Sequence, residues 1–229
     1  MDEKKSEKSK GAETENTNSK IGHLHFDVST GLKRVLGREL ITDDEVAIFE
    51  MVKNSFDAGA SEVVIYFDVD RFVIADNGAG MSYQDILTKW LFVAYSSKRS
   101  GAAINYRDAA AERTHFAGSK GIGRFSSDRI GNHLILQTRS QDEKAGDIHR
   151  MDVDWGLFEE NDKQHFDDIP VAYKENKKFD VPQELRKFAD SLGGGTVIEI
   201  NQLRRVWSRE ELLNLKAALA KLINPFGAE

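Results

Sequence analysis

The segment RFVIADNGAGM, residues 71–81, limits the possible folds more than any other part of this sequence. Its first half is a short apolar run, which is typical of a buried β-strand. An acid, an amide and two glycines then follow, before Met81. Asn-Gly is a common turn pair, so the segment could simply turn the chain toward a helix. Alternatively, Asp76 ends the strand as a ligand-binding acid, and Gly78 and Gly80 let a ligand approach the backbone.

Secondary structure can be predicted on both sides of this segment. Residues 1–20 hold almost no apolar side chains, and we expect a disordered tail. Hydrophobic alternation and capping signals predict the following elements. Strands are expected at 23–28, 62–70, 71–76, 133–139 and 196–200, and helices at 29–37, 42–58, 83–94, 124–131 and 212–223. Two stretches, 95–120 and 141–190, are polar and show little periodicity, so no element is predicted there.

The helix predicted to begin at Thr42 carries an unusual set of polar residues. Glu50, Asn54 and Asp57 are spaced by four and three positions, so they share one helical face. An apolar stripe is expected on another face, formed by Val46, Phe49, Met51, Val52 and Phe56. The polar face could be a solvated surface, or it could hold a ligand, and its spacing alone leaves both open.

A third glycine cluster, GSKGIG, occupies residues 118–123 behind the long polar stretch. Backbone N–H groups of glycines at a helix start can bind an anion, but a flexible loop would look the same. The cluster is neither a P-loop nor a Rossmann fingerprint, because the required Gly-Lys-Ser/Thr and glycine spacing are absent.

Composition excludes several classes of function. The net charge of -6 disfavours generic nucleic-acid binding, and the absence of cysteine excludes disulfides and thiolate sites. There is no apolar run long enough to cross a membrane and no apolar signal core. We therefore expect a soluble cytoplasmic protein that does not bind a membrane.

The order of these segments resembles the GHKL superfamily, which joins gyrase, heat-shock-90 chaperones, histidine kinases and MutL. EMVKNSFDA is similar to its first motif, DNGAGM to its second, GSKGIGRFS to its third and GGGTVIEI to its fourth. The resemblance covers residues 21–229, which we interpret as one ATP-binding domain. It implies the α/β Bergerat fold: a two-layer sandwich in which helices cover one face of a mixed, largely antiparallel sheet, with a lid over ATP.

The resemblance also implies roles at the adenine end of the nucleotide. Asp76 would accept a hydrogen bond from the adenine amino group, which contributes roughly 1.5–3 kcal/mol for a charged acceptor. Gly78 belongs to the same motif, Gly80 would leave room for the base, and Met81 would pack on it. Thr196 would join this end through its hydroxyl group.

At the phosphate end, Asn54 would be the protein ligand of Mg²⁺, which needs few protein ligands because it keeps several waters. Glu50 would orient and deprotonate the attacking water, and Asp57 would support the site.

The remaining contacts would come from the segment between the second and third motifs. Residues 95–117 would form the lid, with Ser97 and Lys98 near its hinge, although Lys98 could equally be a solvated surface charge. The phosphates would lie on the glycine loop, formed by Gly118, Lys120, Gly121, Ile122 and Gly123.

The function implied is Mg²⁺-dependent ATP binding with slow hydrolysis, which closes the lid and gates dimerisation or partner engagement. A histidine-kinase-like domain is one alternative, but that branch usually has Asn in place of Glu50 and a phosphoacceptor helix upstream. His23 and His25 lie instead in a predicted strand. A nucleotide-gated interaction module with negligible hydrolysis is the other alternative.

The chain ends with LINPFGAE, where the resemblance places the end of the ATP-binding domain. We expect it to be the N-terminal part of a longer protein that forms a nucleotide-dependent homodimer. In gyrase and MutL relatives a following domain supplies a lysine to the γ-phosphate. The client, protein or nucleic acid, cannot be read from the sequence.

Overall fold

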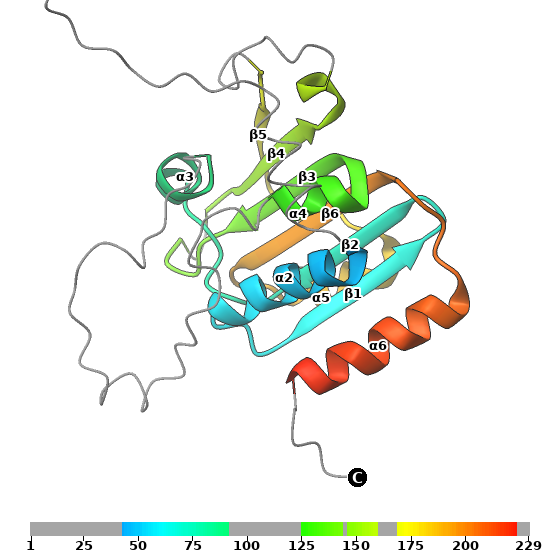
Figure 1. Ribbon diagram of the computed structural model, residues 1–229. Helices are drawn as coiled ribbons and strands as arrows, with labels where there is room; N and C mark the ends of the chain where they lie inside the picture. Colours follow the sequence, from blue (N-terminus) through cyan, green and yellow to red (C-terminus); the bar gives the residue numbers. More distant parts are fainter. Residues whose placement is uncertain (1–42, 92–124, 144–145, 160–168, 224–229) are drawn as a thin grey trace, which may run out of the picture.

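The computed structural model describes residues 43–91, 125–143, 146–159 and 169–223, and the elements are labelled as in Figure 1. The strands are β1 (Val63–Asp68), β2 (Arg71–Asp76), β3 (Gly131–Arg139), β4 (Ile148–Asp154), β5 (Ala172–Asn176) and β6 (Gly195–Leu203). The longer helices are α2 (Asp44–Asp57) and α6 (Arg209–Ile223). The short helical segments are α3 (Tyr83–Asp85), η2 (Ile86–Trp90), α4 (Ser126–Ile130), η5 (Gly156–Phe158), η7 (Gln183–Leu185) and α5 (Arg186–Ser191).

The strands form one six-stranded sheet in the order β1-β2-β6-β3-β4-β5. All five pairings among the described strands are antiparallel, which confirms the expectation of a largely antiparallel sheet. The last strand in the chain, β6, lies between β2 and β3. The ends of β2, β3 and β6 are therefore brought together, and the site described below lies there.

The main core lies between the sheet and the layer that contains α2, α4 and α6 (Figure 1). Side chains at alternate positions of β2, such as Phe72 and Ile74, point into this layer because successive residues of a strand face opposite sides. Val73 and Ala75 point to the other face, where they pack against Leu185 and Leu192 beside α5. The helical layer thus covers one face as expected, and a short helix adds a smaller cluster on the other.

Local signals explain where the helices begin and end. The side chain of Asp43 caps α2 by accepting from the backbone N–H of Glu45 at 2.7 Å, so the helix begins one residue later than a Thr42 cap predicts. Gly59, with a φ of 76°, follows its C-terminal end. Ser82 and Asp85 form the capping box predicted for the next helix.

Two expectations are wrong. The polar stretch 141–190 contains β4, β5 and α5, although no element was expected there. In the expected stripe of α2, Val46 and Phe56 are exposed, and the helix buries Ala47, Ile48 and Ser55 together with Met51 and Val52.

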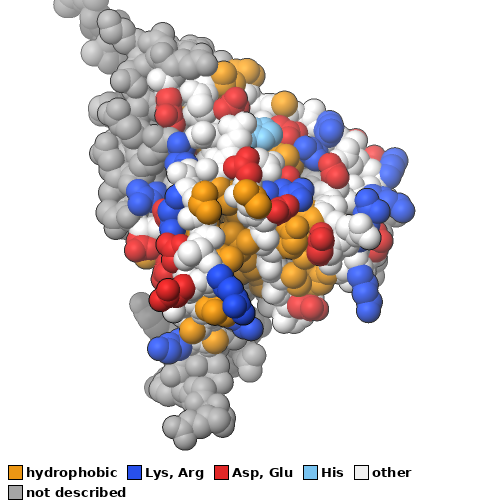
Figure 2. All heavy atoms as spheres, turned by 90° about the vertical axis from the view of Figure 1, so that its right-hand side faces the viewer, with side chains coloured by type: hydrophobic (Ala, Val, Ile, Leu, Met, Phe, Trp, Pro, Cys, Tyr) orange, Lys and Arg blue, Asp and Glu red, His pale blue; other side chains and the backbone are white. Residues whose placement is uncertain are grey.

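Charged side chains of both signs are interspersed over the face shown in Figure 2, with apolar side chains between them. Lys and Arg do not gather there into one patch. None of the helices in the described ranges has the length and apolarity needed to cross a bilayer.

Candidate functional site

A row of polar residues crosses the helix-covered face of the sheet at the end of β2. Asp76 pairs with Thr196, Thr196 with Thr138, Thr138 with His149, and His149 with Glu175. Residues paired directly across neighbouring strands point to the same face. The sheet therefore places the acid of the second motif beside the threonine of the fourth.

Asp76 is a buried acid held in a defined orientation. Its side chain is almost fully buried and accepts from Ser55 Oγ at 2.8 Å (Oδ2) and from the Gly78 backbone N–H at 2.9 Å (Oδ1). Burial raises the pKa of Asp76 above 3.8, while the hydrogen bonds from Gly78, Ser55 and the Thr196 backbone oppose that shift. These hydrogen bonds hold the carboxyl group in one orientation at the end of β2.

Thr196 and Thr138 form a pair of hydroxyl groups next to this acid. Their Oγ1 atoms are 3.1 Å apart, and Thr138 is fully buried. Thr138 Oγ1 also accepts from the Met81 backbone N–H at 2.9 Å and donates to the Gly195 carbonyl at 3.0 Å. Thr138 thus ties the second motif to the fourth.

Hydrogen bonds with neighbouring segments of the chain hold the turn that follows Asp76. The Asn77 side chain accepts from the backbone N–H of Glu62 at 2.9 Å. The amide of Gln141 donates to the carbonyls of Asn77 and Gly78 at 3.1 and 3.0 Å, and its backbone N–H donates to Ala79 at 2.9 Å. These contacts fix the turn in one conformation.

Two glycines of the site are required by close backbone approach. A Cβ at Gly80, where φ is 64°, would lie 1.9 Å from the Arg139 carbonyl oxygen. A Cβ at Gly195 would lie 2.2 Å from the Asp76 carbonyl oxygen. The packing of β3 and β6 against the turn therefore demands glycine at position 80, whether or not a base also needs the space.

The polar face of α2 is more open. Asn54 and Asp57 are exposed, and Glu50 is half-buried and lies 3.4 Å from Lys53 Nζ. The buried face of the helix is formed by other residues, as the spacing predicts. Ser55 turns toward Asp76, so the helix that carries Glu50 and Asn54 is joined directly to the acid of the second motif.

The other residues predicted for the site lie outside the described part of the chain. They are Ser97, Lys98, Gly118, Lys120, Gly121, Ile122 and Gly123, together with the expected lid 95–117.

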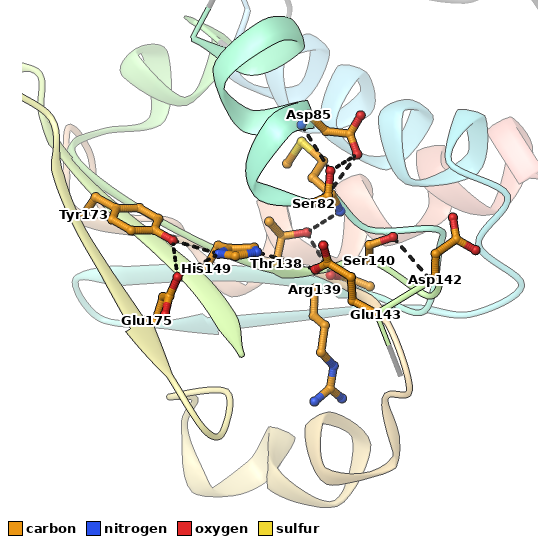
Figure 3. Close-up of polar contacts among 12 residues, drawn as sticks. Ser82, Asp85, Thr138, Arg139, Ser140, Asp142, Glu143, His149, Tyr173 and Glu175 are labelled. Carbon is orange, nitrogen blue, oxygen red and sulfur yellow. Dashed lines mark hydrogen bonds and ion pairs between the residues drawn. The ribbon is translucent and has the colours of Figure 1, made fainter. Parts of the chain in front are cut away.

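The far end of the polar row is an aromatic cluster (Figure 3). Burial, with Glu175 next in effect, raises the pKa of the Tyr173 hydroxyl, which donates to Glu175 at 2.9 Å. Because the hydroxyl has one proton, its contact of 2.8 Å with His149 Nδ1 must be donated by the histidine. The ring of Tyr83 lies beside both rings and holds α3 against β4 and β5.

A cavity of about 710 Å³ lies behind the Asp76 turn. It is lined by Glu62, Asn77, Gln141, Asp142, Phe188, Ser191, Leu192, Gly193 and Gly194. Its lining includes Asn77 of the second motif and Gly193 and Gly194 of the fourth, but neither Asp76 nor Thr196.

Ser55 and Thr138 are the site residues that the sequence interpretation missed. Ser55 lies within the first motif, and one signal was its position a helical turn after Met51 on the buried side. Thr138 ends a predicted strand, and nothing in its local sequence distinguishes it from an ordinary strand residue.

Comparison with known proteins identifies this fold as an ATPase-type nucleotide-binding domain. Residues 41–189 match the family described as "Histidine kinase-, DNA gyrase B-, and HSP90-like ATPase". This match covers more than half of the chain, which therefore belongs to the GHKL superfamily of ATPase domains.

Similar proteins include chaperones and one protein of another kind. Chaperone protein HtpG of Nitrosospira multiformis is 26% identical over 194 residues, which cover 76% of this chain and 29% of that protein. HtpG of Ehrlichia canis is 27% identical over 146 residues, or 54% of this chain and 23% of that protein. HgiDII of Herpetosiphon aurantiacus, assigned as a putative type II restriction enzyme, is 34% identical over 110 residues, which cover 47% of this chain and 17% of that protein. The matched region spans less than a third of each of these relatives.

Proposed function

We propose that this domain binds ATP together with Mg²⁺ and hydrolyses it slowly. The observation that carries the proposal is the buried carboxylate of Asp76, oriented by Ser55 and Gly78 and paired across the sheet with Thr196. A buried acid is costly unless it gains partners, and an amino group on a purine base supplies one. The family match supports ATP as the nucleotide.

The polar face of α2 suits the phosphate end. Among the described residues, no cluster of three or more His, Asp and Glu could hold a metal ion. An exposed Asn54 amide oxygen nevertheless fits Mg²⁺, which prefers oxygen and keeps much of its water shell when it binds phosphates. When bound, Mg²⁺ would neutralise phosphate charge. Glu50, one helical turn before Asn54, would accept the proton of the attacking water, with Asp57 supporting the site.

We infer that nucleotide binding gates an interaction, either with a second copy of the chain or with a partner. The relatives carry the matched region within a chaperone and within a protein assigned as a restriction enzyme. Similarity to proteins with such different names supports a domain that gates an interaction. Residues 95–117 would form the lid, with Ser97 and Lys98 at its hinge, and the loop 118–123 would hold the phosphates. We place this activity in the cytoplasm.

Calorimetric titration with ATP, with and without Mg²⁺, tests the proposal. Asp76→Asn should weaken ATP binding by at least about tenfold, because a charged hydrogen bond is lost. Asp190→Asn is the matched control, since Asp190 is an exposed acid on α5. Equal ATP affinity of the wild type and Asp76→Asn would exclude Asp76 as an ATP-binding residue.

A further inference from the structure

The hydroxyl group of Thr138 makes three polar contacts in a fully buried position. It lies 2.9 Å from the Met81 backbone nitrogen, 3.0 Å from the Gly195 carbonyl oxygen and 3.1 Å from Thr196 Oγ1. This one oxygen atom therefore contacts both the turn after β2 and the threonine of β6.

Proton counting assigns a direction to each contact. A threonine hydroxyl has one proton and two lone pairs. The backbone N–H of Met81 donates to Thr138, and the Gly195 carbonyl can only accept, so the single Thr138 proton is used on Gly195. The second lone pair of Thr138 then accepts from Thr196, whose own proton is occupied in turn.

Thr196 is half-buried, and with its proton turned toward Thr138 it presents lone pairs to the site. Asp76, its neighbour across the sheet, is also an acceptor when ionised. Both groups at this end of the site therefore favour a ligand edge that donates. An exocyclic amino group donates two protons, whereas a carbonyl oxygen at the same position of a purine donates none.

We propose that Thr138 is a specificity-determining positioning residue: by holding the Thr196 hydroxyl as an acceptor, it makes the site select 6-amino purines over 6-keto purines. This inference rests on the proposed nucleotide binding. Thr138 acts through Thr196 and, being fully buried, is not itself expected to contact the base.

Thr138→Val tests the proposal, because valine keeps the shape of threonine and removes the hydroxyl. Thr196 is then free to rotate its proton toward the ligand and to donate to a 6-keto oxygen. Since this gain applies to ITP and not to ATP, the ratio of the ITP Kd to the ATP Kd should fall by at least about tenfold. Thr138→Ser keeps the hydroxyl and should keep the wild-type ratio.

Calorimetry with ATP and ITP separates the outcomes. An unchanged ratio in Thr138→Val would overturn the inference, and so would equal weakening of both nucleotides, which is what a purely structural role predicts. If Thr138→Val does not fold, as judged by its thermal unfolding, Thr196→Val replaces it. That variant must lower the ratio, and an unchanged ratio would overturn the inference. A wild-type protein that binds neither nucleotide would instead contradict the proposed function.

Discussion

The two ends of the candidate site are built differently. At the Asp76 end, Ser55 of α2 donates to Asp76, which pairs across the sheet with Thr196, and the hydroxyl groups of Thr196 and Thr138 are in contact. On the polar face of α2, Asn54 is exposed and Glu50 has an ion pair with Lys53 across a half-exposed surface. The first end is held by buried hydrogen bonds, while the side chains described at the second end are exposed or half-buried. Changes at the first end should therefore affect folding and affinity, and changes at the second should affect turnover.

The largest expected effect is on turnover. Glu50→Ala should bind ATP as the wild type does and lose at least about 100-fold in hydrolysis rate, because a positioned general base contributes roughly 10²–10⁴-fold. Its free energy of unfolding should stay within about 0.5 kcal/mol of the wild type, since the residue is on the surface side of α2. Single-turnover hydrolysis, calorimetry and denaturant unfolding measure the three quantities.

Lys53→Ala is the control for that experiment. The pair with Glu50 is partly exposed, so its loss should change turnover by no more than about threefold. Equal hydrolysis by Glu50→Ala and the wild type would exclude Glu50 as the base.

The next effect is on stability, and it should appear only at the organised end. Gly80→Ala would place a Cβ 1.9 Å from the Arg139 carbonyl oxygen at a φ of 64°. Gly59→Ala also has a positive φ, of 76°, but nothing lies within 4 Å of its Cβ. Gly59→Ala should therefore cost only the backbone strain, about 1–2 kcal/mol, and Gly80→Ala at least about 2 kcal/mol more.

Denaturant unfolding of both variants measures the difference directly. A similar loss of stability in Gly80→Ala and Gly59→Ala would mean that β3 does not pack closely against the turn at Gly80. The contrast between the two ends of the site would then be weaker.

The smallest effect concerns pH. Burial raises the pKa of Asp76, and the Ser55 hydroxyl opposes that shift, so Ser55→Ala should raise the pKa further. ATP binding needs the ionised acid, so affinity is present above the pKa and is lost as pH falls through it. Ser55→Ala should weaken binding several-fold at neutral pH, and its loss of affinity should begin at a higher pH than in the wild type.

Folding stability changes with pH in the opposite direction. A carboxyl group whose folded pKa lies above 3.8 contributes most stability below that value, and the contribution falls as pH rises through the folded pKa. Asp76→Asn has no carboxyl group that titrates at this position. Its free energy of unfolding, relative to that of the wild type, should therefore rise as pH increases through the folded pKa of Asp76. Unfolding midpoints and ATP titrations across a pH series test both statements, and parallel curves for Ser55→Ala and the wild type would contradict them.

The same contrast explains which features could be predicted from the sequence. Strands β1 and β2, the Ser82 cap and the first motif on α2 are encoded by neighbouring residues, and these predictions are confirmed. The Thr138 contacts depend on residues more than 50 positions away, so no local pattern reveals them.

The missed strand β5 has a different cause. Four of its five residues are exposed at the edge of the sheet, so it lacks the apolar alternation by which strands are recognised. The roles expected for Asn54 and Glu50 remain predictions, as do those of Asp57 and the glycine loop.

The position of β6 has a consequence for how the protein is made. A ribosome releases β1 and β2 early and β3 to β5 later, but the strand that joins these two groups leaves last. Until then, the inner edges of β2 and β3 have unpaired backbone groups, which favour association with other chains. The pairing of Asp76 with Thr196 forms only when β6 inserts, so nascent chains cannot complete the nucleotide site before the sheet is closed.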